Sequence, residues 1–219
     1  MRALLVLLFL AMGCASGQQL VEQRATRGTS DRLAVLLTGD GGWRRVDQQV
    51  AKYLRADGID VVGFSTPDYF RERRTPEESA AALERVIRDY MQQWGKRRIV
   101  LVGYSRGADV LPFMASRLPQ DLRDAVDVIA LLGAEPMIDF KYHPSWIPFH
   151  HPHEKQFPVL PEIEKLRGQR IICIYGDREK SSLCPMLDPS LATIVRKPGG
   201  HHFAGHYDAI AAEIVKAAR

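Results

Sequence analysis

Ser105 stands at the centre of a Gly-x-Ser-x-Gly pattern, Gly103-Tyr104-Ser105-Arg106-Gly107. An apolar run precedes the pattern at residues 98–102, and a segment expected to be helical follows it at residues 108–116. A serine on a sharp turn between a strand and a helix is the arrangement of an enzymatic nucleophile. Glycines on both sides keep side chains out of the turn, and the helix N-terminus stabilises a developing negative charge. The pattern therefore predicts that Ser105 attacks a carbonyl carbon.

Such a reaction needs N–H groups that stabilise the oxyanion. The residue after the nucleophile supplies the first, which is the N–H of Arg106. The second comes from the loop after an early core strand, here the glycine-rich residues 38–43 after the apolar run 33–37. By spacing we place this donor at the N–H of Asp40, with Gly41 as the neighbouring alternative.

The base and the acid should follow Ser105 in the order acid, then histidine. Two histidines, His201 and His202, lie on the turn after the last predicted strand. We favour His202 because the histidine of such loops usually precedes a large apolar residue, and we keep His201 as the second choice. The acid should lie just past the strand that ends at Tyr175. Glu179 and Asp177 both fit, and we favour Glu179 because it stands three residues after the glycine.

The elements that position these residues alternate between strands and helices. Strands are predicted at 33–37, 59–64, 98–102, 126–132, 170–175 and 191–195, and helices at 47–56, from 76, at 108–116 and at 208–218. Continuous apolar runs are typical of buried parallel strands. The fold class is therefore α/β, a mainly parallel, doubly wound sheet of about six strands with flanking helices. The order of nucleophile, acid and histidine is that of the α/β-hydrolase fold.

The N-terminal residues have the features of an export signal. Arg2 precedes an apolar stretch, residues 3–12, that is too short to span a bilayer, and small residues then precede Cys14. We expect residues 1–14 to be a lipoprotein signal with Cys14 lipidated, 15–30 a flexible tether, and 31–219 a single hydrolase domain. The protein is then periplasmic and tethered to a membrane, or soluble in the periplasm if cleavage falls near Ala15 and Cys14 carries no lipid.

Composition is consistent with one globular domain and with export. The net charge of +4 over 219 residues is too weak and scattered to indicate nucleic-acid binding. With Cys14 lipidated, Cys173 and Cys184 remain, and an oxidising compartment lets them form a disulfide. The alternative is two reduced, buried thiols.

Residues 133–161 break the strand–helix pattern with six prolines and several aromatic residues. We interpret the segment as a lid or substrate wall, because a long irregular loop is usually functional. Its histidines His150, His151 and His153 do not have the spacing of a metal site. We expect no metal and no other cofactor.

Several motifs together resemble one family. These are residues 38–43 (Thr-Gly-Asp-Gly-Gly-Trp), the serine motif at 103–113, the Tyr-Gly and downstream Cys at 175–184, and Pro-Gly-Gly-His-His-Phe at 198–203. They resemble the bacterial virulence protein family VirJ/AcvB, and the resemblance covers roughly residues 30–219. Arg106 and Arg71 depart from it, where an apolar and an aromatic residue would be expected.

The resemblance implies a periplasmic serine hydrolase that cleaves the aminoacyl ester of aminoacyl-phosphatidylglycerol, alanyl favoured and lysyl second, through an aminoacyl-Ser105 intermediate. The partners would be that lipid, the membrane surface and type IV secretion components. Trp43, Arg71 and Glu135 are candidates for the substrate mouth, and Arg106, Arg71, Arg73 or Arg74 for contact with the lipid phosphate. The alternatives are another esterase, thioesterase or lipase with the same triad, or a non-catalytic, secretion-associated binding protein.

Overall fold

The computed structural model describes residues 20–143 and 156–219. The signal peptide, Cys14 and the histidines His150, His151 and His153 lie outside the described residues. Within them, no helix is both long enough and apolar enough to cross a bilayer.

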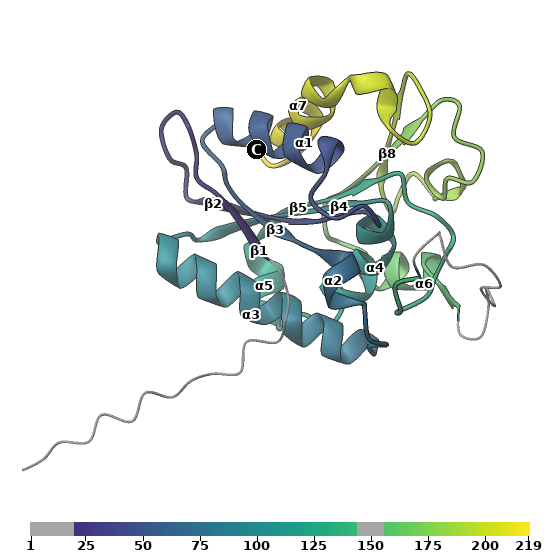
Figure 1. Cartoon of the computed structure of the whole chain (residues 1–219), viewed down its shortest axis with the longest axis horizontal. Coiled ribbons are helices and arrows are strands. Elements are labelled where there is room, and N and C mark those ends of the chain that lie inside the picture. The colour runs from purple at the N-terminus through teal and green to yellow at the C-terminus, as the bar shows by residue number, and fades with distance from the viewer. Residues whose placement is uncertain (1–19, 144–155) are drawn as a thin grey trace, which may run out of the picture.

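A seven-stranded sheet runs through the centre of the molecule in the order β1-β3-β2-β4-β5-β8-β9 (Figure 1). Six of its strands are parallel: β2 (Arg32–Leu37), β3 (Asp60–Phe64), β4 (Arg98–Tyr104), β5 (Val126–Leu132), β8 (Ile171–Gly176) and β9 (Thr193–Lys197). The predicted α/β-hydrolase architecture is confirmed, and the six predicted strands are these six.

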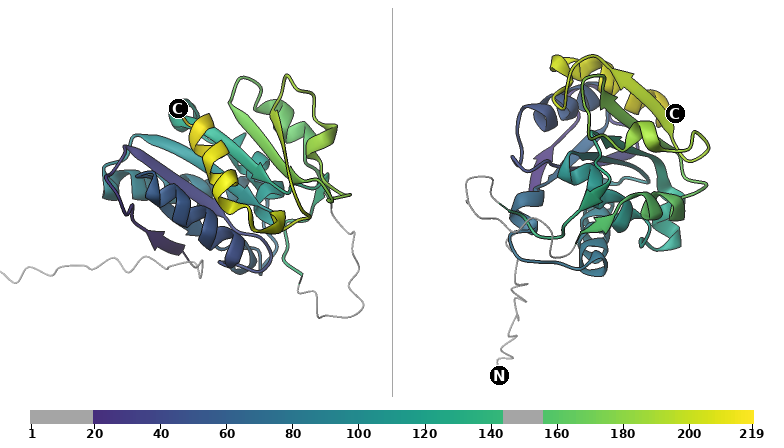
Figure 2. Two further views of the ribbon diagram at one scale, coloured as in Figure 1. Left: turned by 90° about the horizontal axis from the view of Figure 1, so that it is seen from above. Right: turned by 90° about the vertical axis from the view of Figure 1, so that its right-hand side faces the viewer.

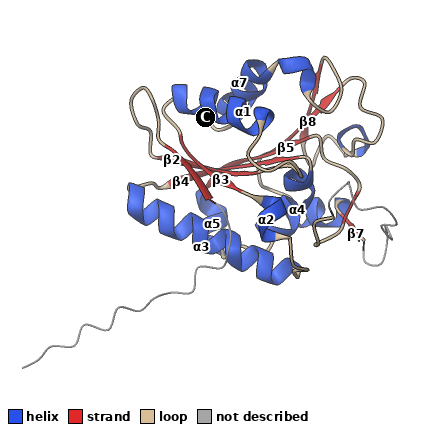
Figure 3. Ribbon diagram, viewed as in Figure 1, coloured by secondary structure: helices blue, strands red, loops and turns tan. Residues whose placement is uncertain are grey.

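Helices cover both faces of the sheet (Figures 1 and 3). One face packs against α1 (Arg45–Ala56) and α7 (Tyr207–Ala217), and the other against α3 (Pro76–Trp94), α4 (Arg106–Ala115) and α6 (Leu160–Lys165), with the short helices α2 (Thr66–Tyr69) and α5 (Gln120–Ala125). Successive residues of β2 alternate between the two cores, so Val35 belongs to one and Leu36 to the other. Both faces of each central strand are therefore buried, which explains the apolar runs in the sequence.

The seventh strand corrects the prediction of a flexible tether over residues 15–30. Residues Leu20–Gln23 form β1, which pairs antiparallel with β3 at the edge of the sheet. Tyr90 of α3 donates a hydrogen bond of 2.7 Å to Glu22, and the Arg55 side chain of α1 donates one of 2.8 Å to Gln23. The sheet thus includes Leu20–Gln23, which lie before the predicted domain boundary at residue 31. The strand is short and polar, and for this reason the apolar pattern did not reveal it.

The described ends of the irregular segment 133–161 are anchored in the core. The strands β6 (Met137–Ile138) and β7 (Phe157–Pro158) pair as a short antiparallel ribbon. Phe140 is fully buried and contacts Phe113 and Phe157 edge-on, with ring centroids 5.1 and 5.4 Å apart. The two views in Figure 2 show the ribbon beside the β5 and β8 end of the molecule.

Candidate active site

Ser105 occupies the sharp turn between β4 and α4. Its backbone has φ 54° and ψ −124°, a positive φ that a residue with a side chain rarely adopts. A Cβ on Gly103 would lie 2.4 Å from the Gly107 carbonyl oxygen, and one on Gly107 would lie 2.2 Å from that of Leu37. The flanking glycines are therefore required by close backbone approach, as the sequence predicted. A strained backbone of this kind is typical of functional positions.

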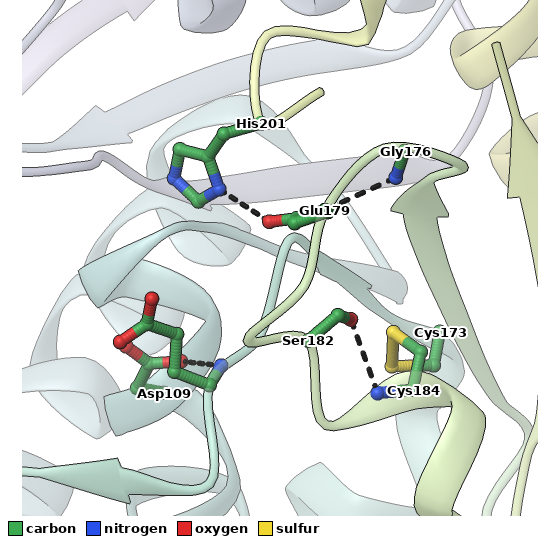
Figure 4. Close-up of a disulfide and its surroundings, with 8 residues drawn as sticks. Asp109, Cys173, Gly176, Glu179, Ser182, Cys184 and His201 are labelled. Atoms are coloured by element: carbon green, nitrogen blue, oxygen red, sulfur yellow. Dashed lines mark hydrogen bonds and ion pairs between the residues drawn. A yellow bond between two sulfur atoms is a disulfide. The ribbon is translucent and has the colours of Figure 1, made fainter. Parts of the chain in front are cut away.

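Glu179 and His201 form the acid–histidine pair of this site. Glu179 follows β8 and His201 follows β9, and the Nδ1 of His201 lies 2.5 Å from a Glu179 carboxylate oxygen (Figure 4). The second Glu179 oxygen accepts the backbone N–H of Gly176 at 3.0 Å, which fixes the carboxylate. A Cβ on Gly133 would lie 2.9 Å from the His201 ring, so this glycine leaves the space that the pair needs.

This geometry corrects the preference for His202. The Nδ1 of His202 lies 2.7 Å from the hydroxyl of Tyr104, and the His202 residue is exposed. Asp177 instead accepts the backbone N–H of Gly199 at 2.8 Å and so holds the turn that carries both histidines. Glu179 therefore pairs with the second-choice histidine, and Asp177 has a structural contact of its own.

The pair alters the titration of the histidine. The hydrogen bond to Glu179 raises the pKa of His201 above its usual value near 6.5, although partial burial opposes the shift. The negative charge of Glu135 acts in the same direction more weakly. A histidine held by a carboxylate at Nδ1 is oriented and made more basic at its other nitrogen.

A cavity of about 470 Å³ contains both Ser105 and His201. The cavity lies at the carboxyl end of the parallel strands, where ligands bind in open α/β sheets. It is lined by Gly39, Asp40, Gly41, Gly42, Arg44, Arg45, Val46, Asp47, Tyr104, Ser105, His201, His202 and Tyr207.

The predicted oxyanion donors lie beside Ser105. Asp40 and Gly41 are the central residues of a turn closed by a 3.0 Å bond from the Gly42 N–H to the Gly39 carbonyl, and both line the cavity. Arg106 is the first residue of α4, so its N–H has no acceptor within the helix. These positions suit the predicted role of two backbone donors.

The Arg106 side chain has a structural role that the sequence did not predict. Its guanidinium donates to the carboxylate of Asp40 and, at 2.8 Å, to the carbonyl of Asp139. Only 11% of the side chain is exposed. From the first residue of α4, Arg106 thus connects the turn after β2 to the chain beyond β6.

The three candidates for the substrate mouth do not line this cavity. Trp43 packs over β3, where a Cβ on Gly63 would lie 2.4 Å from its ring. Arg71 is 75% exposed and pairs with Asp68 at 3.1 Å. Glu135 is exposed and accepts a 3.0 Å hydrogen bond from Ser181.

The other arginines proposed for the lipid phosphate also have partners. Arg73 pairs with Asp139 at 2.7 Å, and Arg74 lies over the Tyr69 ring. In the described part of the chain, the arginines that line the cavity are Arg44 and Arg45, neither of which the sequence singled out.

A disulfide links Cys173 of β8 to Cys184 and so closes the segment that carries Glu179 (Figure 4). The N–H of Leu183 donates to the carbonyl of Ala134 at 2.7 Å, which holds this segment against the end of β5. The predicted Cys173–Cys184 pairing is thus present in the structure.

Asp109, on the first turn of α4, connects the nucleophile helix to the same region. It accepts the Glu135 N–H at 2.7 Å and is almost fully buried (Figure 4). Burial raises the pKa of Asp109 well above its usual range. Contacts among α4, the residues after β5 and the segment after β8 therefore connect the elements that carry Ser105 and Glu179.

Comparison with known proteins places the chain in a family. The family model described as bacterial virulence protein (VirJ) matches residues 31–219, most of the chain. The resemblance predicted from the motifs is thus confirmed. No curated protein matches the chain.

Solved structures share the fold at low sequence identity. Est1E from Butyrivibrio proteoclasticus is 14% identical, with a TM-score of 0.64 and 91% of each chain covered. An esterase from Pyrococcus furiosus is 17% identical, with a TM-score of 0.63, over 91% of this chain and 89% of that one. An alpha-beta serine hydrolase homologue from Coxiella burnetii is 15% identical, with a TM-score of 0.61, over 91% and 90%. At these identities the likeness shows the α/β-hydrolase fold.

Proposed function

The chain belongs to the bacterial virulence protein (VirJ) family, and from this premise we propose that it is a periplasmic serine hydrolase that cleaves the aminoacyl ester of aminoacyl-phosphatidylglycerol. The observation that carries the proposal is the strained Ser105 in one cavity with His201, whose ring is held by Glu179. Similar solved structures include the Pyrococcus furiosus esterase and a thioesterase domain from the curacin biosynthetic pathway, which also supports hydrolysis of an acyl bond.

In the proposed reaction, Ser105 Oγ attacks the carbonyl carbon of the aminoacyl ester while His201 Nε2 accepts its proton. Glu179 keeps the other His201 proton at Nδ1 and stabilises the imidazolium. The N–H groups of Arg106 and Asp40 stabilise the oxyanion. His201 then donates its proton to the leaving glycerol oxygen, which frees phosphatidylglycerol and leaves an aminoacyl ester on Ser105. Water, activated by His201, hydrolyses that ester.

The aminoacyl lipid is proposed from the family, and alanyl is favoured over lysyl as the acyl group. A lipid anchor on Cys14 would raise the local concentration of enzyme at its substrate. Arg45 is the better candidate for the lipid phosphate than the four arginines first considered, because it lines the cavity and none of its side-chain atoms pairs within the described residues.

The test uses purified protein and vesicles of phosphatidylglycerol that carry alanyl- or lysyl-phosphatidylglycerol. We expect release of free alanine, and more slowly of lysine, with recovery of phosphatidylglycerol. Ser105→Ala should abolish release, whereas Ser190→Ala, at an exposed serine, should leave it intact. Serine-dependent cleavage of simple esters without cleavage of either lipid would favour another esterase or thioesterase. Absence of any Ser105-dependent hydrolysis would favour a binding protein.

A further inference from the structure

Asp47 is a buried carboxyl group in the wall of the cavity that holds Ser105. It lies in the first turn of α1, and the residue is only 1% exposed. Its Oδ2 accepts the backbone N–H of Arg44 at 3.2 Å, as a capping carboxylate does. Its Oδ1 is buried and has no hydrogen-bond partner among the described residues. Capping therefore accounts for one carboxylate oxygen and leaves the other unused.

A buried carboxylate without a compensating partner is costly, and proteins normally pair such groups. Burial raises the pKa of Asp47 to about 7, although nearby backbone N–H groups lower it in part. Two arginines line the same cavity, yet neither forms an ion pair with Asp47 in the described part of the chain. The Arg44 guanidinium instead donates to the carbonyl of Gly41 at 3.1 Å. The site therefore has an acceptor that lacks a cation.

The other acidic residue of the cavity, Asp40, differs from Asp47 both in burial and in ion pairing. Asp40 is half exposed, and Arg106 already neutralises it. Tyr104, Tyr207 and His202 complete the wall on the side of Asp47, and the negative charge of Asp47 raises the pKa of Tyr104 further, in addition to the effect of burial. In the described wall, Asp47 is thus the unneutralised carboxyl group.

We propose that Asp47 binds the α-ammonium group of the aminoacyl part of the substrate and so selects cationic acyl groups. The inference rests on the proposed hydrolase function and deepens it. The α-ammonium is attached to the carbon next to the reacting carbonyl, so its acceptor must share a cavity with the nucleophile. Asp47 and Ser105 do so. Gly39 lies next to both, since a Cβ there would lie 3.2 Å from the Ser105 Cβ and its backbone N–H is one of those that lower the pKa of Asp47. The ammonium group supplies the charge-assisted hydrogen bond that Oδ1 lacks.

The test compares two glycerol esters that differ by one group. In the alanyl ester an ammonium occupies the place of one methyl of the isobutyryl ester, so the two share shape and leaving group. Asp47→Asn keeps the shape of the residue and an oxygen that can accept the Arg44 N–H. A hydrogen bond to a charged group is worth a factor of roughly ten to a hundred. We therefore expect Asp47→Asn to lower the ratio of kcat/KM for alanyl over isobutyryl ester by about that factor, with isobutyryl hydrolysis retained.

Asp57→Asn, at an exposed carboxylate just beyond the other end of α1, serves as the matched control and should leave the ratio unchanged. Equal losses on both esters in Asp47→Asn would overturn the inference in favour of a purely structural role and leave the hydrolase proposal standing. A different result would contradict the hydrolase proposal itself: the wild-type protein would show no Ser105-dependent cleavage of either ester.

A second measurement covers the case in which Asp47→Asn does not fold. L-Alaninol and 2-methylpropan-1-ol differ by the same exchange of ammonium for methyl. Both are tested as inhibitors of isobutyryl ester hydrolysis by the wild-type protein. We expect the cationic compound to bind at least about tenfold more tightly. Equal inhibition by the two compounds would overturn the proposed ammonium site.

Discussion

His201 and His202 are adjacent in the chain, but their rings bond to different partners. One ring meets Glu179 and the other meets Tyr104. The two residues that follow them, Phe203 and Ala204, both have positive φ, at 54° and 47°. The backbone therefore turns sharply here, and the side that each histidine faces depends on that turn. The sequence pattern does not show this turn, and it therefore cannot tell which of the two histidines meets Glu179.

The assignment of the acid and the base is tested by two pairs of variants. We expect His201→Ala to lower kcat for ester hydrolysis by about two to four orders of magnitude, because it removes the general base. His202→Ala should have a much smaller effect, since its ring contacts Tyr104. Comparable losses in both variants would contradict the assignment.

Glu179→Gln should reduce kcat and also shift the pH profile, whereas Asp177→Asn should do neither. The base must be neutral, so activity falls as the pH drops below the pKa of His201. The Glu179 hydrogen bond raises that pKa. Its loss lowers the pKa, and the acid limb of kcat/KM should move to lower pH in Glu179→Gln. An acid limb at the wild-type position would argue against Glu179 as the partner of the base.

At the scale of elements, the acid reaches its place on a segment that is fixed at both ends. Glu179 lies between Cys173 and Cys184, which are joined by the disulfide at a sequence separation of 11 residues. The N–H of Cys184 donates a further hydrogen bond of 3.2 Å to the Ser182 hydroxyl oxygen. The residues between β8 and the helical turn Cys184–Met186 form no helix or strand of their own. The disulfide thus adds a covalent link to the hydrogen bonds that hold the carboxylate in place.

Replacement of both cysteines by alanine tests this link. In the chain-entropy model, a disulfide that closes a loop of this length stabilises the folded protein by about 3 kcal/mol. The free energy of unfolding measured in urea should therefore fall by nearly that amount. We also expect kcat to fall, because Glu179 is held less firmly, while the pH at which His201 titrates becomes lower. Titration of the unreduced protein should find neither Cys173 nor Cys184 as a free thiol. Two free thiols would contradict the disulfide.

The sequence predicted the elements better than their contacts. Each of the six parallel strands was predicted from an apolar run. In five of them, β2, β3, β4, β5 and β8, burial on both faces removes polar residues from the strand. The Arg106 side chain was a candidate for contact with the lipid phosphate, but its guanidinium reaches Asp40 and Asp139, which are distant in sequence. Asp47 was predicted only as the first residue of a helix, and nothing in the sequence shows that one of its oxygens lacks a partner.

At the scale of the whole molecule, the carboxyl ends and the amino ends of the parallel strands have different roles. The carboxyl edge of the parallel strands carries the cavity. At the opposite edge, Asp60 at the start of β3 is fully buried and pairs with Lys96 at 2.7 Å. Lys96 also donates to the carbonyl of Ser30, and Asp60 accepts the N–H of Ala25. This cluster ties residues 25–30, which connect β1 to β2, to the base of the sheet.

Lys96→Met tests the cluster. The substitution removes the buried cation and leaves the Asp60 carboxylate with only the half-exposed Arg24, at 3.4 Å. Breaking a buried ion pair typically costs about 3–5 kcal/mol of folding free energy. We expect a loss of that size in urea unfolding, with ester hydrolysis in the absence of urea retained, because the cavity lies at the other edge. Addition of Asp60→Asn to Lys96→Met should restore much of the stability.

The neighbouring Arg97 provides the control, since it is 81% exposed and pairs with Asp31 at 3.4 Å. Arg97→Met should change stability by less than about 1 kcal/mol. A loss in Lys96→Met no larger than that of the control would contradict a structural role for the buried pair.

The register of β1 bears on how the molecule would stand on a membrane. Leu20 pairs with Phe64, the last residue of β3, so the chain enters the domain at the carboxyl edge, which also carries Ser105. On the proposal that Cys14 is lipidated, five residues, 15–19, separate it from Leu20. Six residue steps reach roughly 20 Å when fully extended. A tether this short, attached at the same end of the sheet as the cavity, would turn the reactive end towards the bilayer and confine hydrolysis to lipids of the leaflet that holds the anchor.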